Sequence, residues 1–222
     1  ALLALQGPRA EAALETIVPG VAALEFMHGA PFEFDGAGIY ATRSGYTGED
    51  GYEITVPNEK AQGLWRALLA HPDVLPIGLG ARDSLRLEAG LSLYGHELDE
   101  TVSPVEAGLL WSIQKHRRSE GGFPGADRIQ HEIAESTSRR IAGIKPEGRA
   151  PARDGTIIMS DGKEVGVITS GGFGPSAGGP VALGFVPPDL AKAGQALELM
   201  VRGKALPAEV IKLPFVAKSF KR

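Results

Sequence analysis

The sequence predicts an α+β protein in which a region of mixed helices and strands, residues 1–135, is followed by a small antiparallel β-barrel, residues 136–222. Two observations support this division. In the first part, segments with helical spacing of apolar residues alternate with segments that read as strands. From Arg139 onward, the apolar segments are short or alternating and are bounded by Asp-Gly, Gly-Gly or Pro, which is typical of a barrel of short strands.

The second part is expected to contain six strands, with Asp161-Gly162 as a hairpin turn. The segment 169–176, Thr-Ser-Gly-Gly-Phe-Gly-Pro-Ser, resembles a loop that cradles phosphate, but it lacks the Gly-Lys-Ser/Thr ending and a following helix. We therefore expect it to be a loop of the barrel. The expected strands are 141–144, 156–159, 164–169, 182–185, 196–201 and 208–213.

The first part is expected to contain several helices among its strands. Pro8 suits the first position of a helix that runs to about Val18. Asn58 is expected to cap a helix whose apolar spacing makes Trp65 a core residue. Residues 115–124, which contain a basic cluster and a Gly-Gly pair, are expected to form a solvated loop. The other expected elements are a strand at 1–5, two or three strands within 21–42, a strand at 52–56, and helices at 80–89 and 126–135.

The composition excludes several kinds of function. The net charge of −4 and the pI near 5.8 argue against a broad surface for nucleic acid. No apolar run approaches the roughly 20 residues that a membrane helix requires. The chain has no cysteine, and its five histidines lack metal-ligand spacing of the His-Glu-x-x-His type. We therefore expect no metal, no nucleic acid and no membrane among its ligands and partners.

A glycine-rich stretch carries the first functional signal. It reads Arg-Ser-Gly-Tyr-Thr-Gly-Glu-Asp-Gly-Tyr-Glu from Arg43 to Glu53, and its glycines recur at every third residue, more often than a folding turn alone needs. The alternation that follows predicts a strand with Glu53 on the face opposite Tyr52 and Ile54. Such a carboxylate can accept two parallel hydrogen bonds from a flat ligand. Taken alone, this segment is better explained as a solvated hairpin end with ordinary acidic residues.

The helix expected at 80–89 carries the second signal. Arg82 and Arg86 lie four residues apart and therefore on one face, where Asp83 and Glu88 can neutralise them. The simplest interpretation is a surface helix with salt bridges. Its flanks, however, are unusually rich in glycine. A helix start that packs against a ligand, with Arg82 in the first turn, would explain both features.

Several stretches together resemble a known family. They are Ala4-Leu-Gln-Gly-Pro8, the stretch 43–53, the run from Gly78 to Leu98, Pro104-Val-Glu-Ala-Gly-Leu-Leu-Trp111, and Lys212-Leu-Pro-Phe-Val216. In order and spacing they resemble the aminomethyltransferase (T-protein) of the glycine cleavage system. The resemblance implies that residues 1–135 are the C-terminal part of the family's folate-binding region and that residues 136–222 are its C-terminal barrel domain.

The resemblance also implies binding residues. Glu53 and Arg82 occupy the positions at which the family grips tetrahydrofolate. The 2-amino and N3–H groups of the pterin form a donor pair that matches a carboxylate, and an arginine supplies donors to acceptor atoms or carboxylates of the ligand. Trp111 matches a family aromatic near the folate. Tyr46 and Glu49 are expected to shape the pocket wall.

Two further positions follow from the same resemblance. Phe220 aligns with an aromatic residue, usually tyrosine, that reaches the folate site, so one hydrogen bond would be lost here. His96 invites a general-base interpretation, but family members with asparagine at this position make a hydrogen-bonding role the better expectation.

The implied activity is transfer of a one-carbon unit. The family takes the aminomethyl group from the lipoyl arm of its partner, the H-protein, releases ammonia, and gives tetrahydrofolate the carbon as 5,10-methylene-tetrahydrofolate. The family's catalytic aspartate belongs to an N-terminal portion that has no counterpart in this sequence, so we expect this chain alone to be inactive. A bacterial cytoplasm and a mitochondrial matrix are both compatible locations.

Two other functions remain open at this point. A folate-dependent segment of a dimethylglycine or sarcosine oxidase shares much of the motif set and would be preceded by a flavin-binding domain. A noncatalytic folate-binding relative that supports iron–sulfur assembly carries a cysteine in its motif, and because this chain has none, that alternative ranks last.

Overall fold

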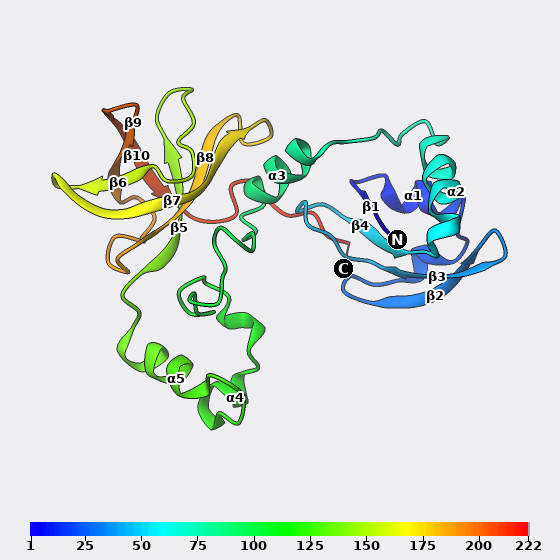
Figure 1. Ribbon diagram of the computed structural model, residues 1–222, viewed down its shortest axis with the longest axis horizontal. Helices are drawn as coiled ribbons and strands as arrows, with labels where there is room; N and C mark the ends of the chain where they lie inside the picture. The colour runs from blue at the N-terminus through cyan, green and yellow to red at the C-terminus, as the bar shows by residue number, and fades with distance from the viewer. Residues whose placement is uncertain (222) are drawn as a thin grey trace. The chain divides into compact units, whose positions relative to one another are not determined.

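The computed structural model describes residues 1–221, which form two compact units. The first unit contains residues 1–86 and the chain end from Ala217, and the second contains residues 87–216. In Figure 1 the sheet of the first unit is drawn in blue and cyan, and the barrel of the second in green to red. The units are defined by contacts within each of them, and the domain boundary expected after residue 135 stays a prediction.

The first unit is built on a four-stranded antiparallel sheet in the order β1-β4-β3-β2. One core cluster joins side chains of helices α1 and α2 to those of the sheet, so both helices cover the same face. Helix α3 follows them toward the end of this unit. The bounds are β1 Leu2–Gln6, α1 Ala10–Glu15, β2 Gly29–Phe34, β3 Ala37–Thr42, β4 Gly51–Thr55, α2 Asn58–Leu69 and α3 Leu79–Glu88, with a short 3-10 turn at Val21–Ala23.

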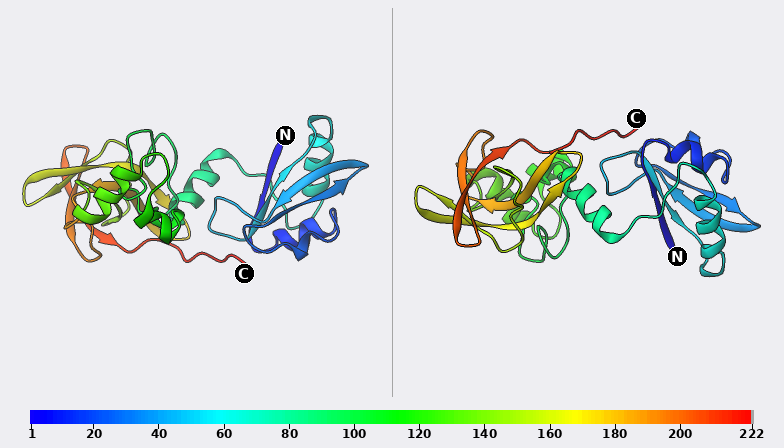
Figure 2. Two further views of the ribbon diagram at one scale, coloured as in Figure 1. Left: turned by 90° about the horizontal axis from the view of Figure 1, so that it is seen from below. Right: turned by 90° about the horizontal axis from the view of Figure 1, so that it is seen from above.

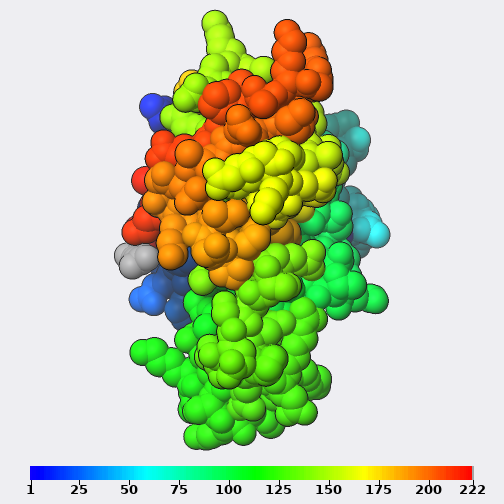
Figure 3. Space-filling view, turned by 90° about the vertical axis from the view of Figure 1, so that its left-hand side faces the viewer, coloured from blue at the N-terminus to red at the C-terminus, as the bar shows by residue number. Residues whose placement is uncertain are grey.

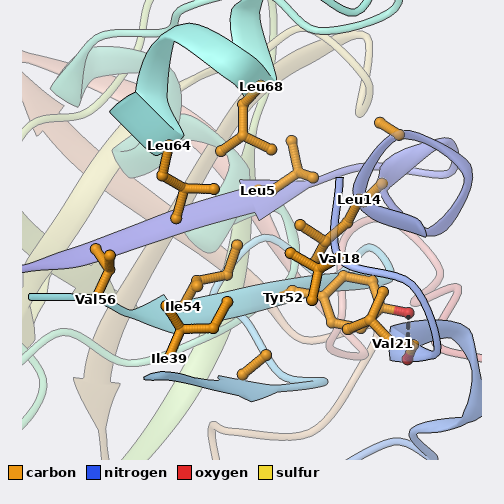
Figure 4. Close-up of a cluster of buried hydrophobic side chains, with 13 residues drawn as sticks. Leu5, Leu14, Val18, Val21, Ile39, Tyr52, Ile54, Val56, Leu64 and Leu68 are labelled. Carbon is orange, nitrogen blue, oxygen red and sulfur yellow. Dashed lines mark hydrogen bonds between the residues drawn. The ribbon is translucent and has the colours of Figure 1, made fainter. Parts of the chain in front are cut away.

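The core of the first unit sets the direction of strand β4. Leu64 and Leu68 of α2 point toward the strands, where Ile54 lies among the fully buried side chains (Figure 4). The hydroxyl of Tyr52, also fully buried, donates a hydrogen bond to the carbonyl of Val21 at 3.5 Å. Burying an aliphatic side chain contributes about 1.5–3 kcal/mol. The alternation predicted for this strand is therefore confirmed, and the core holds its other face outward.

The second unit contains a closed antiparallel barrel of six strands, as predicted, and the strand order is β10-β5-β8-β7-β6-β9. Its strands can be followed from two further sides in Figure 2. The turn between β6 and β7 has Asp161 and Gly162 at φ 49° and 74°, which is the left-handed backbone that a two-residue hairpin turn requires. The bounds are β5 Arg140–Pro146, β6 Ile157–Ser160, β7 Lys163–Gly174, β8 Gly179–Val186, β9 Ala196–Val201 and β10 Lys204–Ile211.

Helical segments precede the barrel in this unit. They are α4 Lys115–Glu120, α5 Ala126–Glu135 and a 3-10 turn at Leu110–Ser112. Figure 3 shows one face of the barrel, in yellow to red, with the green helical segment below it. The expected helix at 126–135 is confirmed. The expected loop at 115–124 is wrong in its first half, because α4 forms there and Arg118 donates a hydrogen bond to the carbonyl of Ile113 at 2.8 Å.

Three expectations for the first unit need correction. Helix α1 begins at Ala10 rather than at Pro8 and ends at Glu15. Asn58 does not cap α2; it is the first helical residue, and its Oδ1 accepts a hydrogen bond from the amino group of Ala1 at 2.8 Å. Trp65 is 43% exposed, because the neighbouring position Leu64 takes the face that meets the sheet.

The glycine-rich segment expected as a barrel loop is instead part of a strand. Residues 169–174 belong to β7 and pair with β8 as far as Gly174 and Gly179. A Cβ on Gly171 would lie 1.8 Å from the carbonyl oxygen of Ala152. Glycine is therefore required at this position because another part of the backbone approaches closely, which is a common reason for glycine within a strand.

Candidate functional site

The three glycines of the stretch 43–53 are required for two different reasons. Gly48 has φ +79°, a conformation that residues with side chains rarely adopt. Gly45 and Gly51 have no such backbone, but the side chain of Gln6 occupies the space beside both. A Cβ on Gly45 would lie 1.8 Å from Gln6 Oε1, and one on Gly51 would lie 2.7 Å from Gln6 Cδ. The turn is thus wrapped around a glutamine from β1.

Glu53 lies half-buried on β4, on the face that points away from the core. Its Oε2 accepts a hydrogen bond from the hydroxyl of Ser44 at 2.7 Å. The hydroxyl of Thr42 lies 2.8 Å from that of Ser44 and donates to the backbone carbonyl of Glu53 at 3.3 Å. These contacts orient the carboxylate. Because each carboxylate oxygen can accept two hydrogen bonds, the group retains capacity for a ligand.

Arg82 lies on α3 and is exposed. Its guanidinium carbon stands 5.0 Å from the ring centre of Tyr46, within the range of a cation–π contact. The structure therefore brings together Tyr46 and Arg82, two of the predicted site residues. Arg86, on the same helix, is only 2% exposed and forms an ion pair with Asp83, one turn earlier in the helix, at 2.8 Å.

The end of the chain contacts the same turn. The backbone N–H of Ser219 donates to the carbonyl of Gly48 at 2.9 Å, and its hydroxyl donates to the carboxylate of Glu49. The ring of Phe220 stacks on that of Phe26, with centres 4.3 Å apart and an angle of 13° between the planes. Of the predicted site residues, Glu49 thus contacts Ser219, and Phe220 is the next residue along the chain.

A cluster of charged side chains, Arg43, Asp50 and Glu11, holds the two ends of the turn together. Arg43 is 1% exposed and grips Asp50 through Nε at 2.9 Å and a terminal nitrogen at 2.6 Å. The same terminal nitrogen donates to Glu11 at 2.6 Å. Burial works against the charge of Asp50, but the hydrogen bonds from Arg43 prevail and hold the pKa of that carboxyl below its usual value. Burial raises the pKa of Tyr52, beside this cluster, to about 12.

Sequence reasoning assigned no role to several of these residues. Gln6 stood in a recognised motif, but its partners lie 38 to 46 residues away and leave no local pattern. Arg43 and Asp50 have opposite charges and bracket the glycine-rich stretch, and that was a usable signal. Ser44, within the stretch, could not be distinguished by sequence from an ordinary serine in a turn.

Trp111 and His96 belong to the second unit. Trp111 lies on the 3-10 turn and is 74% exposed, and its part in the folate site stays a prediction. His96 Nδ1 lies 2.9 Å from the backbone oxygen of Thr169, which is the hydrogen-bonding role expected for it. The neighbouring Glu97 is fully buried and accepts a hydrogen bond from the Thr169 hydroxyl at 2.6 Å.

Two features are absent from residues 1–221. Within this range, no group of three or more His, Asp or Glu side chains is arranged to hold a metal ion. None of the helices in the same range combines the length and the apolar character needed to cross a bilayer.

Comparison with known proteins bears on both parts of the chain. The family model described as the GCVT N-terminal domain matches residues 1–117, and the one described as the glycine cleavage T-protein C-terminal barrel domain matches residues 139–217. A crystal structure of glycine cleavage system aminomethyltransferase T from Bartonella henselae superposes with a TM-score of 0.94 at 43% sequence identity, covering 100% of this chain and 61% of that one.

Two curated relatives show the same similarity. A probable mitochondrial aminomethyltransferase of Schizosaccharomyces pombe is 45% identical over 218 residues, which are 97% of this chain and 56% of the relative. An aminomethyltransferase of Nostoc sp. is 46% identical over 222 residues, which are 99% of this chain and 58% of the relative. The chain therefore spans a little over half the length of these relatives. With both family models matched in order and the fold shared with the Bartonella structure, the chain belongs to the glycine cleavage T-protein family.

Proposed function

We propose that this chain is the folate-holding part of a glycine cleavage aminomethyltransferase. The reaction takes the aminomethyl group from the lipoyl arm of an H-protein, releases ammonia and leaves the carbon bonded to N5 and N10 of tetrahydrofolate. The chain spans just over half of its relatives, so we propose for its own residues the binding and orientation of tetrahydrofolate.

The observation that carries this proposal is the oriented carboxylate of Glu53. The hydroxyl of Ser44 holds Oε2 at 2.7 Å, and the strand below it is fixed by the fully buried side chains of Tyr52 and Ile54. A rigid carboxylate matches the adjacent 2-amino and N3–H donors of a pterin. Charge-assisted hydrogen bonds of this kind are roughly twice as strong as neutral ones, so the pterin end would be held in one orientation.

Arg82 and Tyr46 add the second contribution. Their contact at 5.0 Å steadies a cationic group beside the turn that leads to Glu53. An arginine in this place can donate to the acceptor atoms of the pterin or to the carboxylates of the folate tail. We assign Glu49, Phe220 and Trp111 to the walls of the folate site by family resemblance.

The chemistry asked of these residues is positioning. Tetrahydrofolate must present N5 to the carbon on the lipoyl arm. Holding two reactants in the correct geometry can lower the activation barrier of such a bimolecular step by several kcal/mol, up to about 7–11 kcal/mol in the best cases. We assign no catalytic residue within this chain. Because the chain spans just over half of these relatives, we propose that it does not turn over alone.

Titration calorimetry with tetrahydrofolate tests the proposal. Glu53→Ala leaves two ligand donors unpaired, which costs on the order of 1–3 kcal/mol, or roughly a 5- to 150-fold loss of affinity. Glu33→Ala, at an exposed position on β2 of the same sheet, is the matched control and should bind as the unchanged chain does. Equal affinity of the Glu53→Ala variant and the unchanged chain would remove Glu53 from the site.

The partner and the compartment follow from the same proposal. A lipoyl-bearing H-protein is the partner that the transferred group requires. Relatives of this chain include mitochondrial proteins of eukaryotes and a protein of the bacterium Nostoc, so we propose the mitochondrial matrix or the bacterial cytoplasm according to the source of the chain.

A further inference from the structure

We propose that Gln6 is the positioning residue of the turn 44–52, and through this turn of Glu53; the inference rests on the function proposed above. Gln6 is the last residue of β1, and its Cα pairs with that of Gly51 on β4. Its side chain leaves the ladder and enters the turn. Gln6 is not expected to touch the ligand; it acts through the residues that do.

The amide of Gln6 binds the turn at three points. Its Nε2 donates to the carbonyl of Ser44 at 3.0 Å and to the carbonyl of Tyr52 at 3.3 Å. Its Oε1 accepts a hydrogen bond from the hydroxyl of Thr47 at 3.1 Å. One planar group therefore ties the start, the middle and the end of the turn to strand β1.

The packing around this amide is as close as the hydrogen bonding. A Cβ on Gly45 would lie 1.8 Å from Oε1 and 2.4 Å from Cδ of Gln6, and a Cβ on Gly51 would lie 2.7 Å from Nε2. Real Cβ atoms do not approach other atoms within 3.0 Å. A side chain at either position would collide with the amide, and at Gly51 also with the carbonyl oxygen of Leu5, 2.6 Å from the Cβ position.

The tie continues from Gln6 to the candidate ligand contacts. Ser44, whose carbonyl Gln6 holds, donates its own hydroxyl to Glu53 Oε2 at 2.7 Å. Tyr52, whose carbonyl Gln6 also holds, directly precedes Glu53. Tyr46, whose ring contacts Arg82, lies between the two fixed ends of the turn. Loss of the amide would free the carboxylate and the aromatic wall together.

Glutamine is the side chain that satisfies these three contacts at once. Its amide offers two N–H donors and an acceptor oxygen on one plane. An ionised glutamate of the same length has only acceptors, which would face the carbonyls of Ser44 and Tyr52. Asparagine is one methylene shorter, and methionine matches the length without a strong polar group.

The experiment compares Gln6→Met with Gln130→Met in the 222-residue chain. Gln130 is a matched control, because its Nε2 also donates to two carbonyls, those of Arg118 and Ser119, in the second unit. Thr47→Val removes one of the three contacts with little change of shape, together with the hydrogen bond that the Thr47 hydroxyl accepts from the Glu49 N–H at 3.3 Å, and serves as the variant that leaves the fold intact. Each protein is measured by hydrogen exchange of the amides in residues 44–52 and by calorimetric titration with tetrahydrofolate.

Three results are expected. Gln6→Met speeds exchange across residues 44–52 and weakens tetrahydrofolate binding about tenfold or more, which is the effect of roughly one to two lost hydrogen bonds. Thr47→Val has a smaller effect of the same kind. Adding it to Gln6→Met costs less affinity than adding it to the unchanged chain, because its contact with Gln6 is already absent and only the hydrogen bond from the Glu49 N–H is lost. Gln130→Met changes neither measurement.

The outcomes separate this inference from the proposed function. Unchanged exchange and affinity in both Gln6→Met and Thr47→Val, beside a Glu53→Ala variant that loses affinity, would overturn the role of Gln6 and leave the function standing. Failure of the unchanged chain to bind tetrahydrofolate would overturn the function, and exchange in residues 44–52 would then decide the role of Gln6. If Gln6→Met does not fold, Thr47→Val decides it by the same two measurements.

Discussion

Substitution of Gly45 by alanine should destabilise the first unit through the side chain of Gln6 alone. The new Cβ would lie 1.8 Å from Gln6 Oε1, so the glutamine must leave its place and its three hydrogen bonds with the turn are lost. At roughly 0.5–1.5 kcal/mol for each bond, the cost is about 1.5–4.5 kcal/mol. In a Gln6→Ala background the space is already open, and the same substitution should cost close to nothing.

Urea denaturation measures this cycle of single and double variants. Trp65 lies in the first unit and Trp111 in the second, and they are the chain's two tryptophans, so a Trp111→Phe background leaves one fluorescent reporter in the unit of interest. The expected coupling between Gly45→Ala and Gln6→Ala is the whole cost of the single substitution, about 1.5–4.5 kcal/mol. An equal cost of Gly45→Ala in both backgrounds would refute the reasoning.

Two other glycines serve as controls for this cycle. Gly38 on β3 has no positive φ, and nothing lies within 4 Å of a Cβ placed on it, so Gly38→Ala should be nearly neutral in either background. Gly48 has φ +79°. Its replacement by alanine should cost roughly 1–2 kcal/mol from backbone strain, and by the same amount whether or not Gln6 is present.

The remaining predictions concern the charge cluster and the chain end. Arg43→Met leaves the carboxylates of Asp50 and Glu11 without their buried partner and should destabilise the first unit by about 3–5 kcal/mol in urea denaturation. The pKa of Asp50 is lowered in the folded state, so its contribution to the free energy of unfolding is complete above the ordinary carboxyl pKa of about 3.9 and is lost as the pH falls through the folded-state pKa. Arg43→Met should therefore weaken the dependence of the free energy of unfolding on pH in this acid range. An unaltered dependence would contradict the prediction. Phe220→Tyr restores the hydroxyl usual in the family and should tighten tetrahydrofolate binding by about 0.5–1.5 kcal/mol in calorimetry, whereas no gain would place the ring away from the ligand.

Features that rest on neighbouring residues were predictable from the sequence. The alternation at 52–56 depends only on which side chains are apolar, and the burial of Tyr52 and Ile54 follows from it. The barrel strands are bounded by turn residues, and Asp161-Gly162 forms its hairpin with partners next to it in the chain. Local chemistry was sufficient in each case.

Features that depend on a distant contact were not predictable. Trp65 lies within the apolar pattern of its helix, yet only Leu64 and Leu68 pack against the sheet, and the indole stays at the surface. Gly171 gave the appearance of a loop, because the carbonyl of Ala152 that makes it necessary lies far from it in the sequence. The same holds for Gln6, whose contacts with the turn cross 38 to 46 residues.

The glycine-rich stretch is therefore weaker evidence for a ligand than its composition indicates, and Glu53 is stronger evidence. Gly45 is explained by the glutamine beside it, Gly51 by this glutamine and the backbone carbonyl of Leu5, and Gly48 by its own backbone angle, so none of the three requires a bound molecule. The fold does not need Glu53 in the same way. Its carboxylate lies on the face away from the core, receives the Ser44 hydroxyl and still has acceptor capacity. A turn fixed so closely by internal contacts, beside a carboxylate that the core does not use, is the arrangement that preorganised recognition of a flat donor edge requires.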